Sequence, residues 1–540
     1  MKNSVFFLYL IIFLFSGIKT QAQNYLYLLK LKDKNFSQYS IQHPEDFLSQ
    51  KAILRREKYH IPITYSDLPL SPFYLKKISQ TNATIYTKLK WFNSVIVKIP
   101  NDSVLQKLKK LSFIVSIKKL HFHSFSQKYS PPKITESFLP GQWQIQMLNG
   151  QFLHNLNLLG QNITIAILDA GFLHADTLSV FRHLWQNNQI ITVKNFVRPN
   201  HNDIFSYPNH PHGSMVLAVL AGQLGNFTGS APKANYILIQ TEDPTAENLV
   251  EEYFWAAGAQ LADSLGADII SSSLGYFIFN DSLENHSYSQ LNGHTTPVTK
   301  AALMAAQKGI IVVNAAGNEA LNPWHYIIAP ADADSILAVG AVDSLGKIAP
   351  FSSVGPAANG QIKPDIIALG YHTTTINPYT GHLTKASGTS FATPIIAGLT
   401  ACLLQKFPNA TPSQIITAIL QSASLCNNPN NIYGYGLPDF KKAFLILQHS
   451  LNFQSCHLKI KIYPNPTSNF LYFYNENPSN SPFYLYLYDL SGKLLKSFNI
   501  PPAPPSPVFL QLPNLQTNIY LLKINAKNYS SSKKILIINK

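Results

Sequence analysis

The sequence contains few cysteines and few charged residues. Among its 540 residues there are three cysteines, Cys402, Cys426 and Cys456, and 13% of the residues are charged. Three cysteines cannot all pair with one another, so the chain is not a small scaffold held together by disulfides. No group of cysteine and histidine residues has the spacing of zinc ligands, so we assign no metal ligand. An apolar content of 46% is instead sufficient for several folded domains.

Long hydrophobic stretches are absent after the first residues. Residues 1–22 contain Lys2, an apolar stretch from Val5 to Phe15 and small residues near the end, which together are typical of a secretory signal peptide. The apolar stretch is shorter than the ~20 residues that span a bilayer, and no later stretch is long and apolar enough. We therefore expect an exported chain without a membrane span.

Acidic residues are also scarce, and the net charge of +15 at first suggests a nucleic-acid partner. The positive charge is not evenly distributed, however. Basic residues outnumber acidic ones in residues 23–130 and again after residue 457, whereas acidic residues are in excess in residues 131–456. A basic leading segment beside an acidic middle segment fits a partner within the chain better than DNA. We expect no nucleic-acid binding.

Residues 23–135 are interpreted as a small α+β module. Its pattern predicts strands at 25–31, 83–90, 94–99 and 114–119, and helices at 47–56, 72–79 and 104–111. Residues 121–140 are rich in serine, proline, histidine and lysine, a composition that suits an exposed, cleavable linker. The module is therefore either removed by cleavage or an ordinary N-terminal domain that is never removed.

Strands and helices alternate in residues 136–450, which predicts a parallel sheet with helices on both faces. Strands are expected at 162–168, 236–239, 268–275, 310–318, 336–342 and 365–368. Helices are expected at 215–221, 247–265, 297–308, 395–404 and 412–422. The fold class is thus α/β. Functional residues of such sheets gather at the carboxyl ends of the strands.

Four polar residues lie where this pattern would place a reactive site. Asp169 ends a buried strand, His212 precedes a helix, Ser390 opens a helix, and Asn318 follows a strand. Singly, each has an ordinary explanation as a turn or cap residue. Together they supply a nucleophile, a general base and a group that orients the base, as acyl transfer requires. The amide of Asn318 could donate a hydrogen bond to the oxyanion.

These stretches resemble the blocks of the subtilisin-like serine endopeptidases, the subtilases. The similar stretches are 167–171 around the aspartate, 212–216 around the histidine, 315–318, 363–366, and 388–394 around the serine. Ser273, Leu274 and Gly275 resemble the strand that pairs with extended substrate. The chain departs from the common pattern at Ala170, where Thr or Ser is usual, so one possible hydrogen bond near Asp169 is lost. Ser214 and Met215 also replace the usual Thr and His.

The resemblance implies a subtilisin-like fold and the hydrolysis of peptide bonds in proteins or peptides. It assigns Asp169, His212 and Ser390 to a catalytic triad that forms an acyl-enzyme intermediate, with Asn318 at the oxyanion. No cofactor is required for catalysis. Subtilases often bind structural calcium, but no set of calcium ligands can be read from this sequence. Residues 23–135 match by position, size and charge the propeptide that assists folding and blocks the cleft of such enzymes.

Residues 457–540 have a different composition and predict a small antiparallel β-sandwich of short strands. The stretches 463–466, 487–493 and 519–537 resemble the C-terminal sorting domain of type IX secretion. The resemblance implies that the secretion machinery is a partner and that the protein is secreted or displayed at the cell surface. A carbohydrate- or protein-binding module is the alternative interpretation of this region.

Two other functions compete with the peptidase hypothesis. An inactive subtilase-like surface binding protein would retain the fold without catalysis, although the four polar residues are intact. An α/β-hydrolase esterase would need a Gly-x-Ser-x-Gly motif and a serine that precedes the histidine, and the chain has neither feature around Ser390. The sequence specifies neither the side-chain preference at the cleaved bond nor the physiological substrate.

Overall fold

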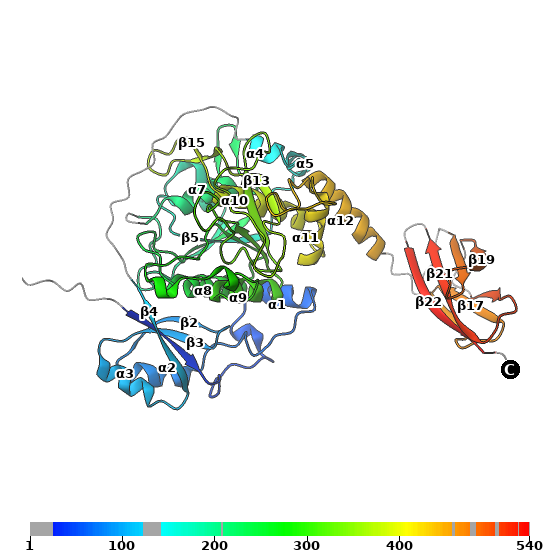
Figure 1. Ribbon diagram of the computed structural model, residues 1–540, viewed down its shortest axis with the longest axis horizontal. Helices are drawn as coiled ribbons and strands as arrows, with labels where there is room; N and C mark the ends of the chain where they lie inside the picture. The colour runs from blue at the N-terminus through cyan, green and yellow to red at the C-terminus, as the bar shows by residue number, and fades with distance from the viewer. Residues whose placement is uncertain are drawn as a thin grey trace, which may run out of the picture. The chain divides into compact units, whose positions relative to one another are not determined.

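The computed structural model describes residues 25–122, 142–206, 209–455, 460–475, 482–502, 507–526 and 529–538. The predicted signal peptide, residues 1–22, and most of the predicted linker, residues 121–140, lie outside the described residues. The chain forms two compact units, Met1–Lys441 and Lys442–Lys540. The first contains an N-terminal module and a central sheet, and the second contains the C-terminal strands (Figure 1).

The N-terminal module is an antiparallel sheet with the strand order β2-β3-β1-β4. Its elements are β1 (Tyr25–Leu31), η1 (Pro44–Asp46), α1 (Gln50–Lys58), α2 (Pro72–Ser79), β2 (Thr84–Leu89), β3 (Ser94–Lys98), α3 (Asp102–Lys109) and β4 (Ile114–His121). Because side chains alternate along a strand, Leu29 and Val97 face α2 and α3, whereas Leu26 and Ile96 face the opposite side. The module therefore has two apolar faces.

The central sheet has seven parallel strands in the order β13-β12-β11-β10-β5-β9-β6. Its strands are β5 (Thr164–Asp169), β6 (Ile190–Asn195), β9 (Asn235–Gln240), β10 (Ile269–Ser272), β11 (Ile311–Ala315), β12 (Leu337–Val342) and β13 (Ile366–Leu369). The longer helices are α7 (His212–Ala221), α8 (Val250–Leu265), α9 (Pro297–Gln307), α10 (Thr389–Lys406) and α11 (Pro412–Ser422). The α/β fold predicted from the sequence is confirmed.

Shorter elements connect these strands and helices. They are α4 (Trp143–Gln146), α5 (Gln151–Asn155), η2 (Ser179–Phe181), α6 (Arg182–Gln186), η3 (Ser282–Glu284), η4 (Tyr288–Gln290) and two hairpins, β7 (Gln223–Leu224) with β8 (Phe227–Thr228) and β14 (Thr373–Ile376) with β15 (Leu383–Ala386). The helix α12 (Phe440–Ser455) runs across the boundary between the two units.

Helices cover both faces of the central sheet because its strands are apolar on both sides. All six residues of β5 are buried. Ala166 and Leu168 pack against α8 and α9, and the alternate residues Ile165 and Ile167 point to the face that α7 and α10 cover. Figure 1 shows α8 and α9 between the central sheet and the N-terminal module. The face of the module that α2 and α3 do not cover includes Leu26, and it belongs to the same hydrophobic cluster as these helices.

The C-terminal strands form two antiparallel sheets, β16-β17-β20 and β19-β18-β21-β22. Their bounds are β16 (Ile460–Tyr463), β17 (Phe470–Asn475), β18 (Phe483–Tyr488), β19 (Leu494–Ile500), β20 (Val508–Gln511), β21 (Asn518–Ala526) and β22 (Tyr529–Ile537). Leu471 from one sheet and Leu485, Leu522 and Ile535 from the other share one buried core. Alternating buried and exposed residues along these strands explain why the sequence predicted a β-sandwich.

Several elements differ from the sequence-based prediction. β6 and β19 differ from the prediction in that no strand was expected there. β6 lies at a sheet edge and is only half-buried, and polar residues interrupt the apolar ones in both strands. α1 begins at Gln50 rather than Phe47, because the Ser49 side chain accepts a hydrogen bond of 3.2 Å from the Ala52 N–H and caps the helix. These differences concern element boundaries and edges, not the architecture.

None of the helices in the described part of the chain is long and apolar enough to cross a membrane. Cys402 is a buried free thiol in α10, as predicted, and burial raises its pKa. Cys426 is also free. Cys456 lies outside the described residues.

Candidate active site

The first two candidate residues meet where β5 ends and α7 begins. Asp169 is the last residue of β5 and is completely buried, and His212 is the first residue of α7. Asp169 Oδ1 lies 2.7 Å from His212 Nδ1. Burial lowers the pKa of His212, but the charge of Asp169 and its hydrogen bond outweigh burial, so this pKa is raised above its usual value. Since a carboxylate only accepts, Nδ1 donates and Nε2 is left for another partner.

The second carboxylate oxygen of Asp169 has no hydrogen-bond partner among the described residues, although it is buried. Asp169 Oδ1, by contrast, accepts from both His212 and the Ala170 N–H, the latter at 2.8 Å. The methyl side chain of Ala170 offers no donor. This agrees with the sequence-based expectation that alanine at this position loses one hydrogen bond near the aspartate.

Ser390 is the second residue of α10 and not its cap. The N-cap position is occupied by Gly388, whose φ of 151° favours glycine. Ser390 Oγ donates a hydrogen bond of 3.3 Å to the Ser273 carbonyl, and no hydrogen bond joins it to His212 among the described residues. The ring of Phe391, the next residue, lies 5.6 Å from the His212 ring, centroid to centroid. The serine and histidine thus lie on neighbouring helix starts without direct pairing.

Asn318 is held against the first turn of α10. Its side-chain oxygen accepts hydrogen bonds from the Thr389 N–H at 2.9 Å and the Thr389 hydroxyl at 3.1 Å. These bonds fix the orientation of the amide and leave its NH₂ group free to donate elsewhere. The Asn318 Nδ2 atom would lie 3.6 Å from a Cβ placed at Gly388, so the donor faces the same helix start as Ser390.

Ser273, Leu274 and Gly275 directly follow β10, which is a neighbour of β5 in the sheet. The Ser273 hydroxyl donates a hydrogen bond of 2.8 Å to the Ser390 carbonyl, and the Leu274 carbonyl accepts one of 3.0 Å from the Asn314 side chain. The backbone N–H and C=O of Gly275 make no hydrogen bond among the described residues. Within this tripeptide, Gly275 therefore has main-chain groups available for a peptide ligand.

The sequence-based reasoning missed an acidic segment next to Asp169. Residues 241–252 follow β9, and the Thr241 N–H donates to the Asp169 carbonyl at 3.0 Å. Burial first, and then the charges of Glu247 and Asp169, raise the pKa of Glu242 well above its usual value. The signal was visible in the sequence as a run of carboxylates after a central strand.

His210 is a second residue that the sequence did not single out. Its Nδ1 accepts a hydrogen bond of 3.3 Å from the His212 N–H. Burial first, and then the neighbouring His212, lower the pKa of His210 to about 4. His210 is therefore neutral at physiological pH, which leaves His212 as the titrating histidine of this corner.

The described residues contain no group of three or more histidine, cysteine, aspartate or glutamate side chains that could hold a metal ion. We therefore assign no calcium ligands. The site consists of an Asp–His pair, a hydroxyl at a helix start and a fixed amide donor. Such an arrangement can move a proton and stabilise a negative oxygen.

Three family models match consecutive parts of the chain. The model of the subtilase family matches residues 160–436. A model of the peptidase S8 propeptide domain of Bacteroidota matches residues 26–134, and a model of a secretion-system C-terminal sorting domain matches residues 461–538.

The chain is also similar to individual proteases. The chain is 29% identical over 298 residues to a thermostable alkaline protease of Halalkalibacterium halodurans. The alignment covers 55% of this chain and 71% of the relative. The chain is 28% identical over 371 residues to subtilisin NAT of Bacillus subtilis subsp. natto, with 68% and 84% covered. A solved structure of MycP1 from the ESX-1 type VII secretion system matches with a TM-score of 0.44 and 22% identity, covering 56% of this chain and 85% of MycP1.

Proposed function

Because this chain belongs to the subtilase family and is a serine-type endopeptidase with a secretion sorting domain, we propose that Asp169, His212 and Ser390 cut its peptide substrates through an acyl-enzyme intermediate. The observation that carries this proposal is the 2.7 Å hydrogen bond between Asp169 and His212, whose ring lies beside Phe391 at the start of the serine helix. It supplies an oriented base next to a hydroxyl.

In the proposed reaction, Ser390 Oγ attacks the carbonyl carbon of the scissile bond while His212 Nε2 takes the hydroxyl proton. The C–N bond then breaks, and His212 returns the proton to the leaving amine. Water attacks the resulting ester in the same way and releases Ser390. Asp169 holds the imidazole in the required tautomer and stabilises its charged form. No step of the proposed reaction uses a metal ion or a cofactor.

The negative oxygen of each tetrahedral intermediate would be held by two donors. One is the NH₂ group of Asn318, which the Thr389 hydrogen bonds orient. The other is the Ser390 N–H, which belongs to the first turn of α10 and has no acceptor among the described residues. The positive end of the α10 dipole acts in the same direction.

Substrate would lie extended beside Ser273, Leu274 and Gly275, with main-chain pairing through the free groups of Gly275. A basic substrate side chain near this strand would stabilise the charged form of Glu242, whose pKa burial raises well above its usual value. Residues 23–135 act as the propeptide, which is removed by the enzyme's own cleavage, and the type IX secretion machinery recognises residues 457–540. These two regions are matched by the propeptide and sorting-domain models.

The catalytic assignment is tested by labelling the secreted full chain with a fluorophosphonate. We expect Ser390→Ala to abolish labelling and to leave the propeptide attached. Ser387→Ala is the matched control, because this exposed serine lies three residues away and its Oγ only accepts from the His372 N–H at 3.0 Å. Normal labelling of Ser390→Ala would refute the nucleophile assignment, and an unlabelled unsubstituted chain would favour an inactive binding protein.

The sorting assignment needs a separate experiment. Residues 457–540 are fused to an inert cargo protein in a bacterium that has type IX secretion. Export of the fusion supports sorting, whereas retention in the periplasm contradicts it and favours a binding module.

A further inference from the structure

Residues 49–68 of the N-terminal module reach the carboxyl ends of α8 and α9. The Ser49 N–H donates to the Ser264 carbonyl at 2.8 Å, and the Lys90 side chain donates to the Ser264 hydroxyl at 2.6 Å. The last carbonyls of a helix have no partner within the helix, and they carry the negative end of its dipole. The ends of α8 and α9 are therefore suited to a positively charged partner.

Two adjacent arginines of α1 occupy these helix ends. Arg55 donates to the carbonyls of Asp263 at 3.2 Å, Lys308 at 3.1 Å and Ala267. Arg56 donates to the same Lys308 carbonyl at 2.8 Å. Asp263 precedes the last two residues of α8, and Lys308 is the C-cap of α9. One arginine pair thus binds the ends of both helices.

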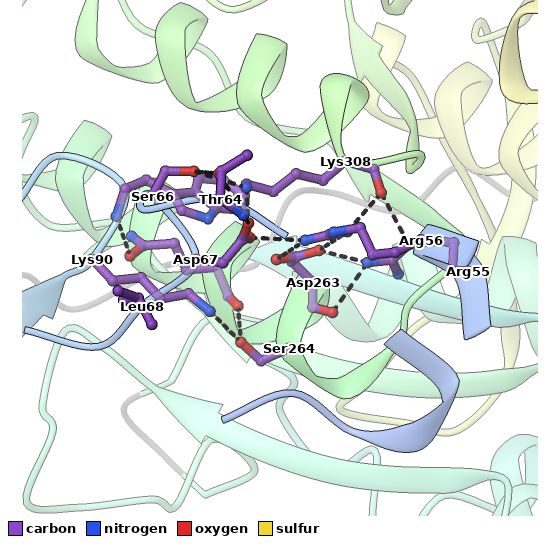
Figure 2. A network of polar contacts seen from close by, with 12 residues as sticks. Arg55, Arg56, Thr64, Ser66, Asp67, Leu68, Lys90, Asp263, Ser264 and Lys308 are labelled. Atoms are coloured by element: carbon purple, nitrogen blue, oxygen red, sulfur yellow. Dashed lines mark hydrogen bonds and ion pairs between the residues drawn. The ribbon is translucent and has the colours of Figure 1, made fainter. Parts of the chain in front are cut away.

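The side chain of Asp263 is the centre of this contact (Figure 2). Asp263 Oδ1 accepts from Arg55 and lies 2.9 Å from an Arg56 nitrogen, and Asp263 Oδ2 accepts from Arg56 at 3.0 Å. Asp263 is completely buried, and Arg55 and Arg56 are 4% and 1% exposed. Buried charges are stable only when they are paired this closely, so the contact depends on both guanidinium groups.

A second carboxylate completes the network from the propeptide side. Asp67 accepts from Arg56 at 3.0 Å and from the Lys308 side chain at 2.6 Å. Burial raises the pKa of Asp67, but Lys308 and Arg56, together with the Thr64 N–H, outweigh burial and bring it to about 2. Asp67 is therefore ionised at any physiological pH, and it ties the loop after α1 to the end of α9.

The fit extends to the backbone at both helix ends. Gly266 is the C-cap of α8, and Gly309 follows the C-cap of α9, each with a positive φ near 80°. A Cβ at Gly266 would lie 2.7 Å from the Lys51 Cβ, and a Cβ at Gly309 would lie 2.9 Å from the Ile61 side chain. The propeptide segment therefore contacts both helix ends closely, and at Gly266 a Cβ would also lie 2.9 Å from the Ala52 backbone nitrogen, which cannot move aside as a flexible side chain can.

This surface lies at the opposite edge of the sheet from the candidate active site. Ala267 and Lys308 precede β10 and β11, so they lie at the amino ends of the parallel strands, whereas Asp169 lies at the carboxyl end of β5. A strand of six residues separates these edges by roughly 16 Å. The contacts made here are thus separate from any contacts in the cleft.

We propose that the carboxyl ends of α8 and α9 form a guanidinium-binding site on the peptidase domain, which Arg55 and Arg56 fill, and which retains the propeptide after the chain is cut. The site is made by Asp263 and the carbonyls of Asp263, Ala267 and Lys308. Its ligand class is a pair of adjacent arginines on a helix. The inference rests on the proposed function only in that the enzyme itself makes the cut.

The test separates retention from catalysis. In the full chain with Ser390→Ala, a recognition sequence for a foreign protease is placed between residues 123 and 141, and the dissociation constant of the cut propeptide is measured. We expect Arg55→Gln with Arg56→Gln to raise this constant by about 100-fold, because Asp263 is left buried without its partners. The control is Lys107→Gln with Lys109→Gln, which removes two exposed charges of α3. It should change the constant by less than about threefold.

A competition experiment covers the case in which the arginine variant does not fold. Free arginine should release the cut propeptide of the unsubstituted interface at a concentration where lysine at equal ionic strength does not, since lysine lacks the planar fork. Equal retention of the arginine variant and the control, or equal release by arginine and lysine, would overturn the proposal. A failure of the catalytic hypothesis would appear separately, as an unsubstituted chain that is not labelled by fluorophosphonate.

Discussion

Two buried aspartates of the first unit, Asp169 and Asp263, are held in opposite ways. Both are completely buried. Asp169 shares one oxygen between His212 and a backbone N–H, and its other oxygen has no partner among the described residues. Asp263 has both oxygens occupied by arginines of the N-terminal module. Asp169 thus has one oxygen without a hydrogen bond and lies beside a histidine that titrates. Both oxygens of Asp263 are bound by arginines, which keep their charge.

The difference separates a carboxylate suited to catalysis from one suited to binding. The charge of Asp169 acts mainly on His212 and raises its pKa, which is useful only if the imidazole gains and loses a proton during turnover. The arginines facing Asp263 never lose their protons, so this carboxylate can only hold its partners in place. Substitutions at the two positions should therefore affect different measurements.

The largest effect is expected for Asp169→Asn. Without the carboxylate the imidazole loses its orientation and tautomer, so kcat should fall by about 10⁴-fold. His212 acts as a base only when neutral, and activity is lost as the pH falls through its raised pKa. Since burial remains and the charge is removed, the acidic limb of the pH profile should move to lower pH. The measurement is kcat/KM against pH on a chromogenic peptide, and an unmoved limb would contradict the assignment.

Asp263→Asn should destabilise the uncut chain without affecting catalysis. Two buried arginines lose the charge of their shared partner, which we expect to lower the free energy of unfolding by about 3 kcal/mol. All five tryptophans lie between residues 91 and 324, so their fluorescence in urea reports on the first unit. The matched measurement is kcat/KM of the processed enzyme, expected to change less than about twofold. If Asp263→Asn lowered kcat and left the free energy of unfolding unchanged, Asp263 would serve catalysis rather than binding, contrary to the comparison with Asp169.

Asn318→Ala tests the donor opposite Ser390. Loss of one oxyanion donor should reduce kcat by about 10²- to 10³-fold, with little change in KM, because the hydrogen bond forms in the transition state. The control is Asn322→Ala, an exposed asparagine four residues later that bonds only Glu319. An equal loss in both variants would indicate general damage to this loop rather than a lost donor.

The fold was predictable because most of its elements carry simple apolar patterns. β5 contains a continuous apolar run, Ile165 to Leu168, as parallel strands covered on both faces do. The amino-terminal ends of α2 and α11 are each marked by a capping hydroxyl followed by proline. β6 was missed because an edge strand needs no such run. The excess of basic residues in the leading segment pointed to a partner within the chain. The charge pattern did not show that the partner surface is at the ends of α8 and α9.

The candidate site was predictable by residue type but not by contact. Chain order and motif identified Asp169, His212, Ser390 and Asn318, because each must follow a strand or open a helix. The role of Thr389 in fixing the Asn318 amide depends on a loop and a helix start that are 71 residues apart. The saturation of Asp263 likewise depends on Arg55 and Arg56, more than 200 residues away. No local pattern reports such contacts.

The smallest effect is expected for Ala170→Ser. This substitution would give Asp169, like Asp263, a hydrogen bond to each carboxylate oxygen. A hydroxyl next to the orphan Asp169 Oδ2 can donate a hydrogen bond, which should stabilise the fold by about 1 kcal/mol. The same bond stabilises the carboxylate and weakens its pull on His212, so the acidic limb of the pH profile should shift slightly to lower pH.

Ala170→Cys is the control for Ala170→Ser, because it has nearly the same shape and only a weak donor. If both substitutions shift the limb equally, the effect comes from packing at this position and not from the hydrogen bond. If serine alone shifts it, then the orphan oxygen of Asp169 maintains the raised pKa of His212. The missing hydroxyl would then set the lowest pH at which this peptidase works.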